Sequence, residues 1–211
     1  MMSTHYRPGR LLAGALLAAV CVATPLRAAI TNGDFETGDL TGWSTFLTTF
    51  GELDTASVAI FDTDGDSVAT NSAELEAGST QPPSVEGGGG ITQTVTMVAG
   101  TVELTADIAA TSHQPNADFG FFELLFDGNP VDSHDFENGS AGITERATLS
   151  YSGVITAGPH DIGIRVTRPY GALPFQYIDN VVLTQQPIPE PSALALLGLA
   201  LVGTICRRRR G

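Results

Sequence analysis

The chain has 211 residues, and its 23 acidic residues outnumber its 10 basic ones, which gives a formal net charge of −13. A surface this acidic repels the phosphates of nucleic acids, so nucleic-acid binding is excluded. The only two cysteines, Cys21 and Cys206, lie near opposite ends of the chain. A fold held together by several disulfides is therefore excluded as well.

The first 28 residues have the pattern of a secretory signal peptide. Arg7 and Arg10 provide the positive charge that precedes an apolar stretch from Leu11 to Val22. Leu26-Arg27-Ala28 then offers a small-residue cleavage site. A permanent N-terminal anchor is the alternative interpretation. Either way, the residues that directly follow are expected outside the cytoplasm.

The last 25 residues, 187–211, combine three features in order. Pro187, Pro189 and Pro191 keep the chain extended. An uncharged run of 14 residues, 193–206, follows. As a helix it would reach only ~21 Å, whereas a bilayer core is ~30 Å thick, so a marginal span needs residues back to Pro191. Arg207, Arg208, Arg209 and Arg210 resist translocation. The alternative is a buried C-terminal helix with a basic tip.

These features resemble the PEP-CTERM sorting signal of Gram-negative bacteria. Pro189, Glu190 and Pro191 match its tripeptide, and Arg207 to Arg210 match its basic cluster. The resemblance implies processing by an exosortase near the tripeptide and transient anchoring in the inner membrane. It further implies delivery to the cell surface or extracellular matrix, and a link to exopolysaccharide and biofilm.

Residues 29–186 form the body, which contains 22 of the acidic residues but only three arginines. Its sequence alternates between apolar and polar residues in short segments separated by turns, with no helical period. This pattern predicts an all-β fold, an antiparallel sandwich or barrel. The strands are expected at 43–50, 57–61, 67–76, 91–98, 102–110, 120–126, 131–136, 143–155, 161–168 and 176–184. The glycine-rich stretch 81–90 is expected to be a loop.

Two short motifs in the body resemble the first and last strands of galactose-binding-like jelly rolls, a fold shared by many carbohydrate-binding modules. They are Asn32-Gly33-Asp34-Phe35-Glu36-Thr37-Gly38 with Trp43, and Tyr177-Ile178-Asp179-Asn180-Val181-Val182-Leu183. On a first strand, Asp34 and Glu36 would share one face. The resemblance implies a structural Ca²⁺ held by Asp34, Glu36 and Asp179. Solvated carboxylates are the alternative.

The segment 168–175 is the candidate site for a sugar. Its prolines and glycine predict a projecting, semi-rigid loop, in which Tyr170 could stack on a sugar ring and Arg168 could donate hydrogen bonds. The alternative is that Tyr170 and Phe175 merely cover a sheet edge. The remaining aromatic candidates, Trp43, Phe119, Phe121, Phe122 and Phe126, are expected in the core.

Catalytic motifs are absent from the sequence: it contains neither G-x-S-x-G nor H-E-x-x-H. His113, His134 and His160 lack metal-ligand spacing and are expected at the surface. The acidic segment 62–66 departs from an EF-hand loop and predicts a hairpin turn. We therefore expect a non-catalytic exported protein that binds or organises exopolysaccharide. A secreted carbohydrate-active hydrolase with an acid pair and a structural matrix protein without a ligand remain the alternatives.

Overall fold

The computed structural model describes residues 30–83 and 85–187. The predicted signal peptide at 1–28, the tripeptide Pro189-Glu190-Pro191 and the arginine cluster 207–210 lie outside the described residues. Within the described ranges the chain forms strands, turns and bends only. Accordingly, that part of the chain contains no helix that is long and apolar enough to cross a membrane.

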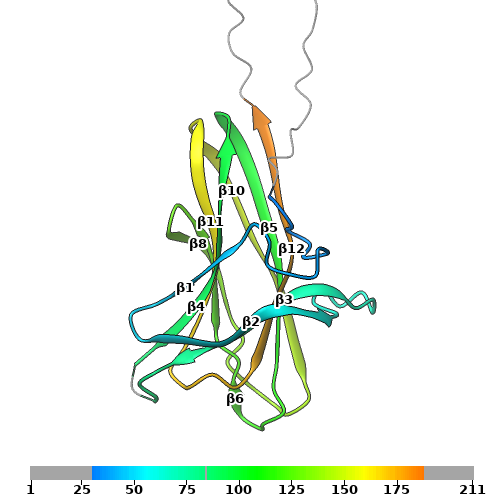
Figure 1. Cartoon of the computed structure of the whole chain (residues 1–211), viewed down its shortest axis with the longest axis vertical. Helices are drawn as coiled ribbons and strands as arrows, with labels where there is room; N and C mark the ends of the chain where they lie inside the picture. Colours follow the sequence, from blue (N-terminus) through cyan, green and yellow to red (C-terminus); the bar gives the residue numbers. More distant parts are fainter. Residues whose placement is uncertain (1–29, 84, 188–211) are drawn as a thin grey trace, which may run out of the picture.

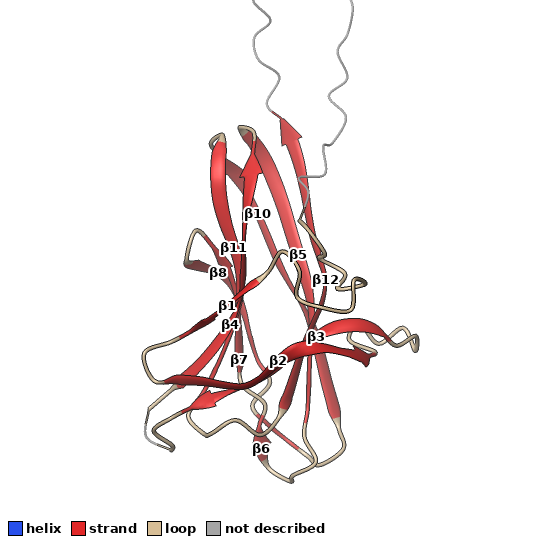
Figure 2. Ribbon diagram, in the orientation of Figure 1, coloured by secondary structure: helices blue, strands red, loops and turns tan. Residues whose placement is uncertain are grey.

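The body is an antiparallel β-sandwich, as the sequence predicts. One five-stranded sheet has the order β1-β4-β11-β7-β8, and the other has the order β10-β5-β12-β3-β2. The two sheets face each other, and a short pair, β6 and β9, lies at one end (Figures 1 and 2). The strands are β1 Ser44–Leu47, β2 Gly51–Phe61, β3 Thr70–Ser79, β4 Gly87–Met97, β5 Gly100–Thr111, β6 Ala117–Asp118, β7 Phe121–Phe126, β8 Asn129–Asp135, β9 Asn138–Gly139, β10 Thr144–Ile155, β11 Gly158–Arg168 and β12 Phe175–Pro187.

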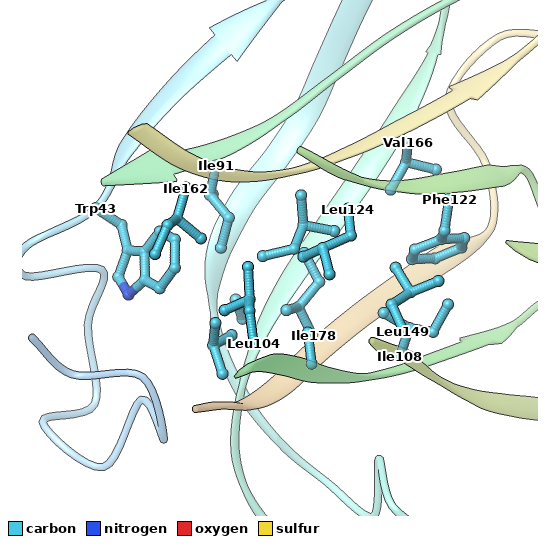
Figure 3. Close-up of a cluster of buried hydrophobic side chains, with 14 of the residues drawn as sticks. Trp43, Ile91, Leu104, Ile108, Phe122, Leu124, Leu149, Ile162, Val166 and Ile178 are labelled. Atoms are coloured by element: carbon cyan, nitrogen blue, oxygen red, sulfur yellow. The ribbon is translucent and has the colours of Figure 1, made fainter. Parts of the chain in front are cut away.

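The core lies between the two sheets. It consists of the side chains that point inward from every second residue of the facing strands. Ile91, Leu124 and Ile162 come from one sheet, and Leu104 and Ile178 from the other, and all five are fully buried (Figure 3). Fully burying a side chain of this size contributes roughly 1.5–3 kcal/mol. Alternation in the sequence predicted these faces, because successive side chains of a strand point to opposite sides.

Most aromatic residues expected in the core are found there. Trp43, Phe119, Phe122 and Phe126 are buried. Phe121, by contrast, is only partly buried. It neighbours Phe122 along β7, so its side chain points to the outer face of the sheet. The expectation for Phe121 was therefore wrong.

The opening segment differs from the predicted strand. Residues 31–34 form a turn, and the first strand begins only at Ser44. Two buried aromatic residues anchor the segment: the rings of Phe35 and Trp43 lie 5.8 Å apart. The indole nitrogen of Trp43 also donates a hydrogen bond to the Asn32 carbonyl oxygen at 3.0 Å. The segment is thus ordered by turns and aromatic packing.

Glycines 87–90 form a strand, so the predicted loop at this position was wrong. They are the first four residues of β4, and all four are buried. Gly90 pairs with Phe46 of β1 and with Arg165 of β11. A Cβ atom added at Gly90 would overlap the carbonyl oxygen of Ile164. These glycines therefore let three strands approach more closely than residues with side chains could.

Strand β12 runs the length of the sandwich between its two ends. It begins at Phe175, after the 169–174 loop, and pairs with β5 as far as Pro187, which lies opposite Gly100. At about 3.3 Å per residue, its 13 residues span roughly 40 Å. We call the end at 169–174 the loop end and the end at Pro187 the tail end; they lie at the bottom and top of Figure 1.

The close approach of β4 to its neighbours predicts that Gly90→Ala is strongly destabilising. We expect a loss of about 3 kcal/mol or more in the free energy of unfolding, because the methyl group would collide with backbone. Denaturant unfolding of the purified body measures this loss. Gly163→Ala is the matched control: its Cβ would meet the Ile91 carbonyl oxygen at 3.2 Å, so a loss near 1 kcal/mol is expected. Equal losses in the two variants would contradict this account.

Candidate functional site

The loop end carries a group of exposed apolar side chains, which we call the platform: Phe50, Tyr170 and Leu173. Tyr170 is 46% exposed, so much of its ring is accessible. The carbonyl oxygens of Tyr170 and Phe50 accept hydrogen bonds from two consecutive amides, those of Ser79 and Thr80, at 2.8 and 2.9 Å. The two aromatic residues therefore lie close together although they are far apart in the sequence.

Hydrogen bonds to the sandwich hold the loop 169–174 in place. Glu52 of β2 accepts a hydrogen bond from the Ala172 amide through Oε1 at 2.9 Å. Gly78 of β3 packs so closely beneath the loop that an added Cβ would overlap the Ala172 nitrogen. The platform is therefore preorganised, which lowers the entropic cost of ligand binding.

Arg168 lies beneath the platform and is only 3% exposed. Its Nη1 donates a hydrogen bond to the Gly171 carbonyl oxygen at 2.7 Å, and its guanidinium carbon lies 5.9 Å from the centre of the Tyr170 ring. Burial lowers the pKa of Arg168, and the carboxylate of Asp118 partly offsets this effect. The expectation that Arg168 contacts a ligand directly is therefore corrected: in this structure it supports the loop and the Tyr170 ring.

A shallow groove of about 200 Å³ lies on the outer face of the sheet β1-β4-β11-β7-β8. Gly163 has no side chain to fill the bottom of the groove. An ion pair lies near the groove on the same sheet face, where Arg165 Nη2 is 2.6 Å from Glu123 Oε2. Apolar and polar side chains together form the groove. Its lining residues are Phe46, Thr92, Leu125, Gly128, Asp161 and Gly163.

Two of the three predicted calcium ligands, Glu36 and Asp179, accept hydrogen bonds from consecutive residues of β3. Glu36 Oε1 accepts a hydrogen bond from the Asn71 amide at 3.0 Å, and Asp179 Oδ2 accepts one from the Thr70 hydroxyl at 2.9 Å. Burial raises the pKa of Asp179, and the negative charge of Glu36 raises it further, against the opposing effect of its hydrogen bonds. Asp34 is exposed and instead accepts a hydrogen bond from the Glu36 amide at 3.4 Å.

Another acidic group, Asp62, Asp64 and Asp66, lies between β2 and β3. Among the described residues it is the one group of three or more potential metal ligands whose ligand atoms all lie within 4.8 Å of one another. Each of the three carboxylates accepts a hydrogen bond from a backbone amide two or three residues further along. The predicted hairpin turn is confirmed, since β2 and β3 pair antiparallel on either side of it.

The three histidines of the body divide into two exposed residues and one buried residue. His113 and His134 are exposed, as expected. His160 is buried, so the prediction for it was wrong. Its Nδ1 lies 2.8 Å from Asp127 Oδ2, and its Nε2 lies 3.0 Å from the Thr156 carbonyl oxygen. Because acceptors face both ring nitrogens, the site favours the doubly protonated imidazolium.

With this geometry in hand, the chain can be compared with known proteins. A model of the PEP-CTERM protein-sorting motif matches residues 187–210. The sorting signal predicted from Pro189-Glu190-Pro191 and Arg207 to Arg210 is therefore confirmed. A search of curated proteins returned no match.

Several solved structures resemble the body in outline, and carbohydrate-binding modules with β-sandwich folds are among them. TmCBM61, solved with β-1,4-galactotriose, is 13% identical with a TM-score of 0.48 and covers 76% of this chain and 100% of its own. A carbohydrate-binding module of the β-sandwich superfamily is 17% identical (TM-score 0.46, 71% and 60% covered). A cyclase from Fischerella sp. is 18% identical (TM-score 0.46, 77% and 97% covered).

The buried His160 predicts a pH-dependent contribution to stability. The hydrogen bond to Asp127 raises the pKa of His160 above its ordinary value of 6.5, the bond to Thr156 adds to this, and burial opposes it. Its stabilisation is therefore complete below about pH 6.5 and is lost as the pH rises through the raised pKa. We expect His160→Gln to lower stability by about 1–2 kcal/mol near pH 5.5 and by less near pH 9.

Denaturant unfolding of the parent and of His160→Gln across this pH range measures the difference in their free energies of unfolding. The titration of the carboxylates that both proteins share cancels in this difference. The exposed His134→Gln serves as the control and is expected to change stability equally little at both pH values. A His160→Gln penalty that stays constant or grows with pH would contradict the account.

Proposed function

We propose that the chain is an exported surface protein that an exosortase sorts through its C-terminal motif, and that its β-sandwich binds polysaccharide without catalysis. The match of residues 187–210 to the PEP-CTERM motif supports the first part. The motif implies export and a membrane-anchored sorting stage. Delivery to the cell surface or matrix, and exopolysaccharide as the ligand, belong to the proposal.

The observation that carries the binding function is the platform at the loop end. An exposed aromatic ring held by a fixed loop is suited to stack on the apolar face of a sugar. Tyr170 provides such a ring, and Arg168 and Glu52 fix the loop that presents it. The platform also lies at the end of the sandwich opposite Pro187, where β12 leads into the sorting motif. It would therefore face away from the anchoring membrane.

The charge of the body favours a neutral polysaccharide. With 22 acidic residues and three arginines, the body repels polyanions such as uronate-rich or sulfated chains. The arginines offer little compensation: Arg168 is buried, and Arg165 and Arg146 are paired with Glu123 and Asp62. An acidic polysaccharide would need divalent cations as bridges.

The groove lined by Phe46 and Leu125 is a second location for the same function. Its apolar walls and its polar Thr92 and Asp161 could receive a sugar unit lying across the sheet. The two locations are far enough apart to be tested separately, because the groove lies on a sheet face and the platform on an end loop.

We also propose a structural Ca²⁺ bound with Glu36 and Asp179. The pair suits a cation because the negative charge of Glu36 acts on the buried carboxylate of Asp179. A bound cation would offset the repulsion between the two carboxylates. Hard oxygen ligands of this kind suit Ca²⁺. The site would fasten the opening segment to the sheet, since the Val181 amide already donates a hydrogen bond to the Gly33 carbonyl oxygen at 2.8 Å. Asp34 fits the set less well, because its side chain serves the turn.

Removing the Tyr170 ring should weaken binding of neutral polysaccharide. We expect Tyr170→Ala to raise the Kd about tenfold, because the variant loses the apolar area that the ring buries as well as a stacking contribution of about 0.5–1.5 kcal/mol. Tyr170→Phe keeps the ring and should bind nearly as the parent does. Glycan-array screening followed by calorimetry on the purified body measures both.

Phe46→Ala separates the two locations. Full binding by Tyr170→Ala with loss in Phe46→Ala would move the site to the groove. Absence of glycan binding by the parent would favour a purely structural protein. Turnover of a polysaccharide that one Asp or Glu substitution abolishes would favour the hydrolase.

Calcium should raise the Tm of the purified body by several degrees, since a ligand bound only to the folded state stabilises it. Asp179→Asn should abolish that calcium-dependent increase, and Asp64→Asn should leave it intact. Thermal unfolding with millimolar Ca²⁺ and with a chelator gives the comparison. If Asp64→Asn alone removed the effect, the 62–66 turn would be the site instead.

A further inference from the structure

Three strands, β4, β10 and β12, end at the tail end of the sandwich. Gly100, which opens β5, pairs with Ile155 at the end of β10 and with Pro187 at the end of β12. Gly158, which opens β11, pairs with Met97 at the end of β4. The turn β4–β5 therefore lies beside the point at which β12 leaves the fold, and the turn β10–β11 lies on the far side of β5 (Figure 1). We call residues 97–101, 154–159 and 185–187 the tail-proximal rim.

The composition of this rim contrasts with the rest of the body. Its three segments, Met-Val-Ala-Gly-Thr, Val-Ile-Thr-Ala-Gly-Pro and Gln-Gln-Pro, contain no acidic residue, although the body contains 22. Two of its aliphatic side chains are exposed to solvent, Val98 by 44% and Val154 by 74%. The rim is thus uncharged and partly apolar, and the nearest exposed acidic residues along β5 and β11, Glu103 and Asp161, each lie two residues beyond it.

A buried glutamine fixes the rim to the departing strand. The side-chain amide of Gln185 donates a hydrogen bond to the Val98 carbonyl oxygen, and its Oε1 accepts one from the Val98 amide at 3.3 Å. Gln185 is buried and lies two residues before Pro187. Val98 therefore cannot move independently of the strand that leads to the sorting motif.

The sequence limits how far this rim can lie from a membrane that the tail spans. The apolar run begins at Ala193, six residue steps after Pro187. Six steps extend at most about 20 Å, and each interfacial layer of a bilayer is itself roughly 5–8 Å deep. Since the 14-residue run is too short for the hydrocarbon core, residues back to Pro191 are needed in the span, which draws the rim closer still.

We propose that the tail-proximal rim rests on the lipid surface of the membrane that holds the tail, with Val98 and Val154 in the headgroup layer. This inference rests on the proposed membrane-anchored stage and adds which residues of the domain contact the lipid. An anionic lipid surface repels acidic side chains within a Debye length of about 8–10 Å. The rim itself carries no acidic residue and can reach the headgroups, while the exposed Glu103 and Asp161, two residues further along their strands at ~7 Å, limit how far this end can sink. The sandwich then stands upright with its platform outward.

Depth-dependent quenching in liposomes tests this orientation with the full chain. Val98→Trp and Val154→Trp each place an indole on the rim. Ile143→Trp is the control, because Ile143 is also exposed but precedes Thr144, at the opposite end of β10. Each variant is reconstituted in vesicles of brominated phosphatidylcholine with about one quarter phosphatidylglycerol. The emission of the buried Trp43, common to all variants, is subtracted using the parent protein.

We expect quenching of the rim tryptophans at least twofold stronger than that of Ile143→Trp. Circular dichroism confirms that each variant is folded. Co-flotation with the vesicles, lost in a chain that lacks residues 188–211, confirms that the tail and not the apolar stretch 11–22 has inserted. Equal quenching of all three positions, or none in a chain that floats, would overturn the proposal and leave the rim as a contact for another protein. A chain that fails to float would instead contradict the membrane-anchored stage.

Discussion

The continuous pairing of β12 with β5 is the interaction on which the arrangement of this molecule depends. The ladder begins with Phe175 opposite Thr111 and ends with Pro187 opposite Gly100. It thereby joins the loop that carries Tyr170 to the point where the sorting motif starts. Its one irregularity, between Asp179 and Val182, lies where the opening segment contacts the strand through Gly33. A single hydrogen-bonded strand thus fixes the positions of the loop that carries Tyr170, Pro187 and the candidate calcium pair relative to one another.

Alternating residue patterns made the sandwich predictable, and their absence explains the errors. Val102, Leu104, Ala106 and Ile108 are all fully buried, as an inward face of a strand requires. Glycines 87–90 have no side chains and hence no pattern, so the sequence did not distinguish a loop from a strand packed too closely for a Cβ. The opening segment was mistaken for a strand because its order comes from the contact between Phe35 and Trp43, which a local pattern does not record.

The parts of the candidate site that a single sequence segment forms were predictable. The parts that combine residues from several distant segments were not. The Pro- and Gly-containing loop placed Tyr170 at the surface correctly. His160 is buried beside a partner that the fold brings to it, Asp127, which is 33 residues away in the sequence. Arg168 is buried although its partners Gly171 and Tyr170 are local, because the loop folds back over it. The groove combines residues from β1, β4, β7 and β11, each with an ordinary sequence context. A signal for His160 did exist, since it alternates with the buried Ile162 and Ile164 on one strand face.

The position of the sorting motif relative to the fold has a consequence for processing. The ladder of β12 ends at Pro187, and the tripeptide Pro189-Glu190-Pro191 begins two residues later. Cleavage at that tripeptide would remove no paired residue of the sandwich, so the body would keep its whole core after release. It would also free the uncharged rim from the membrane while leaving the platform unchanged. A domain with the loop that carries Tyr170 at one end of β12 and the sorting tripeptide just beyond the other can therefore be sorted without refolding.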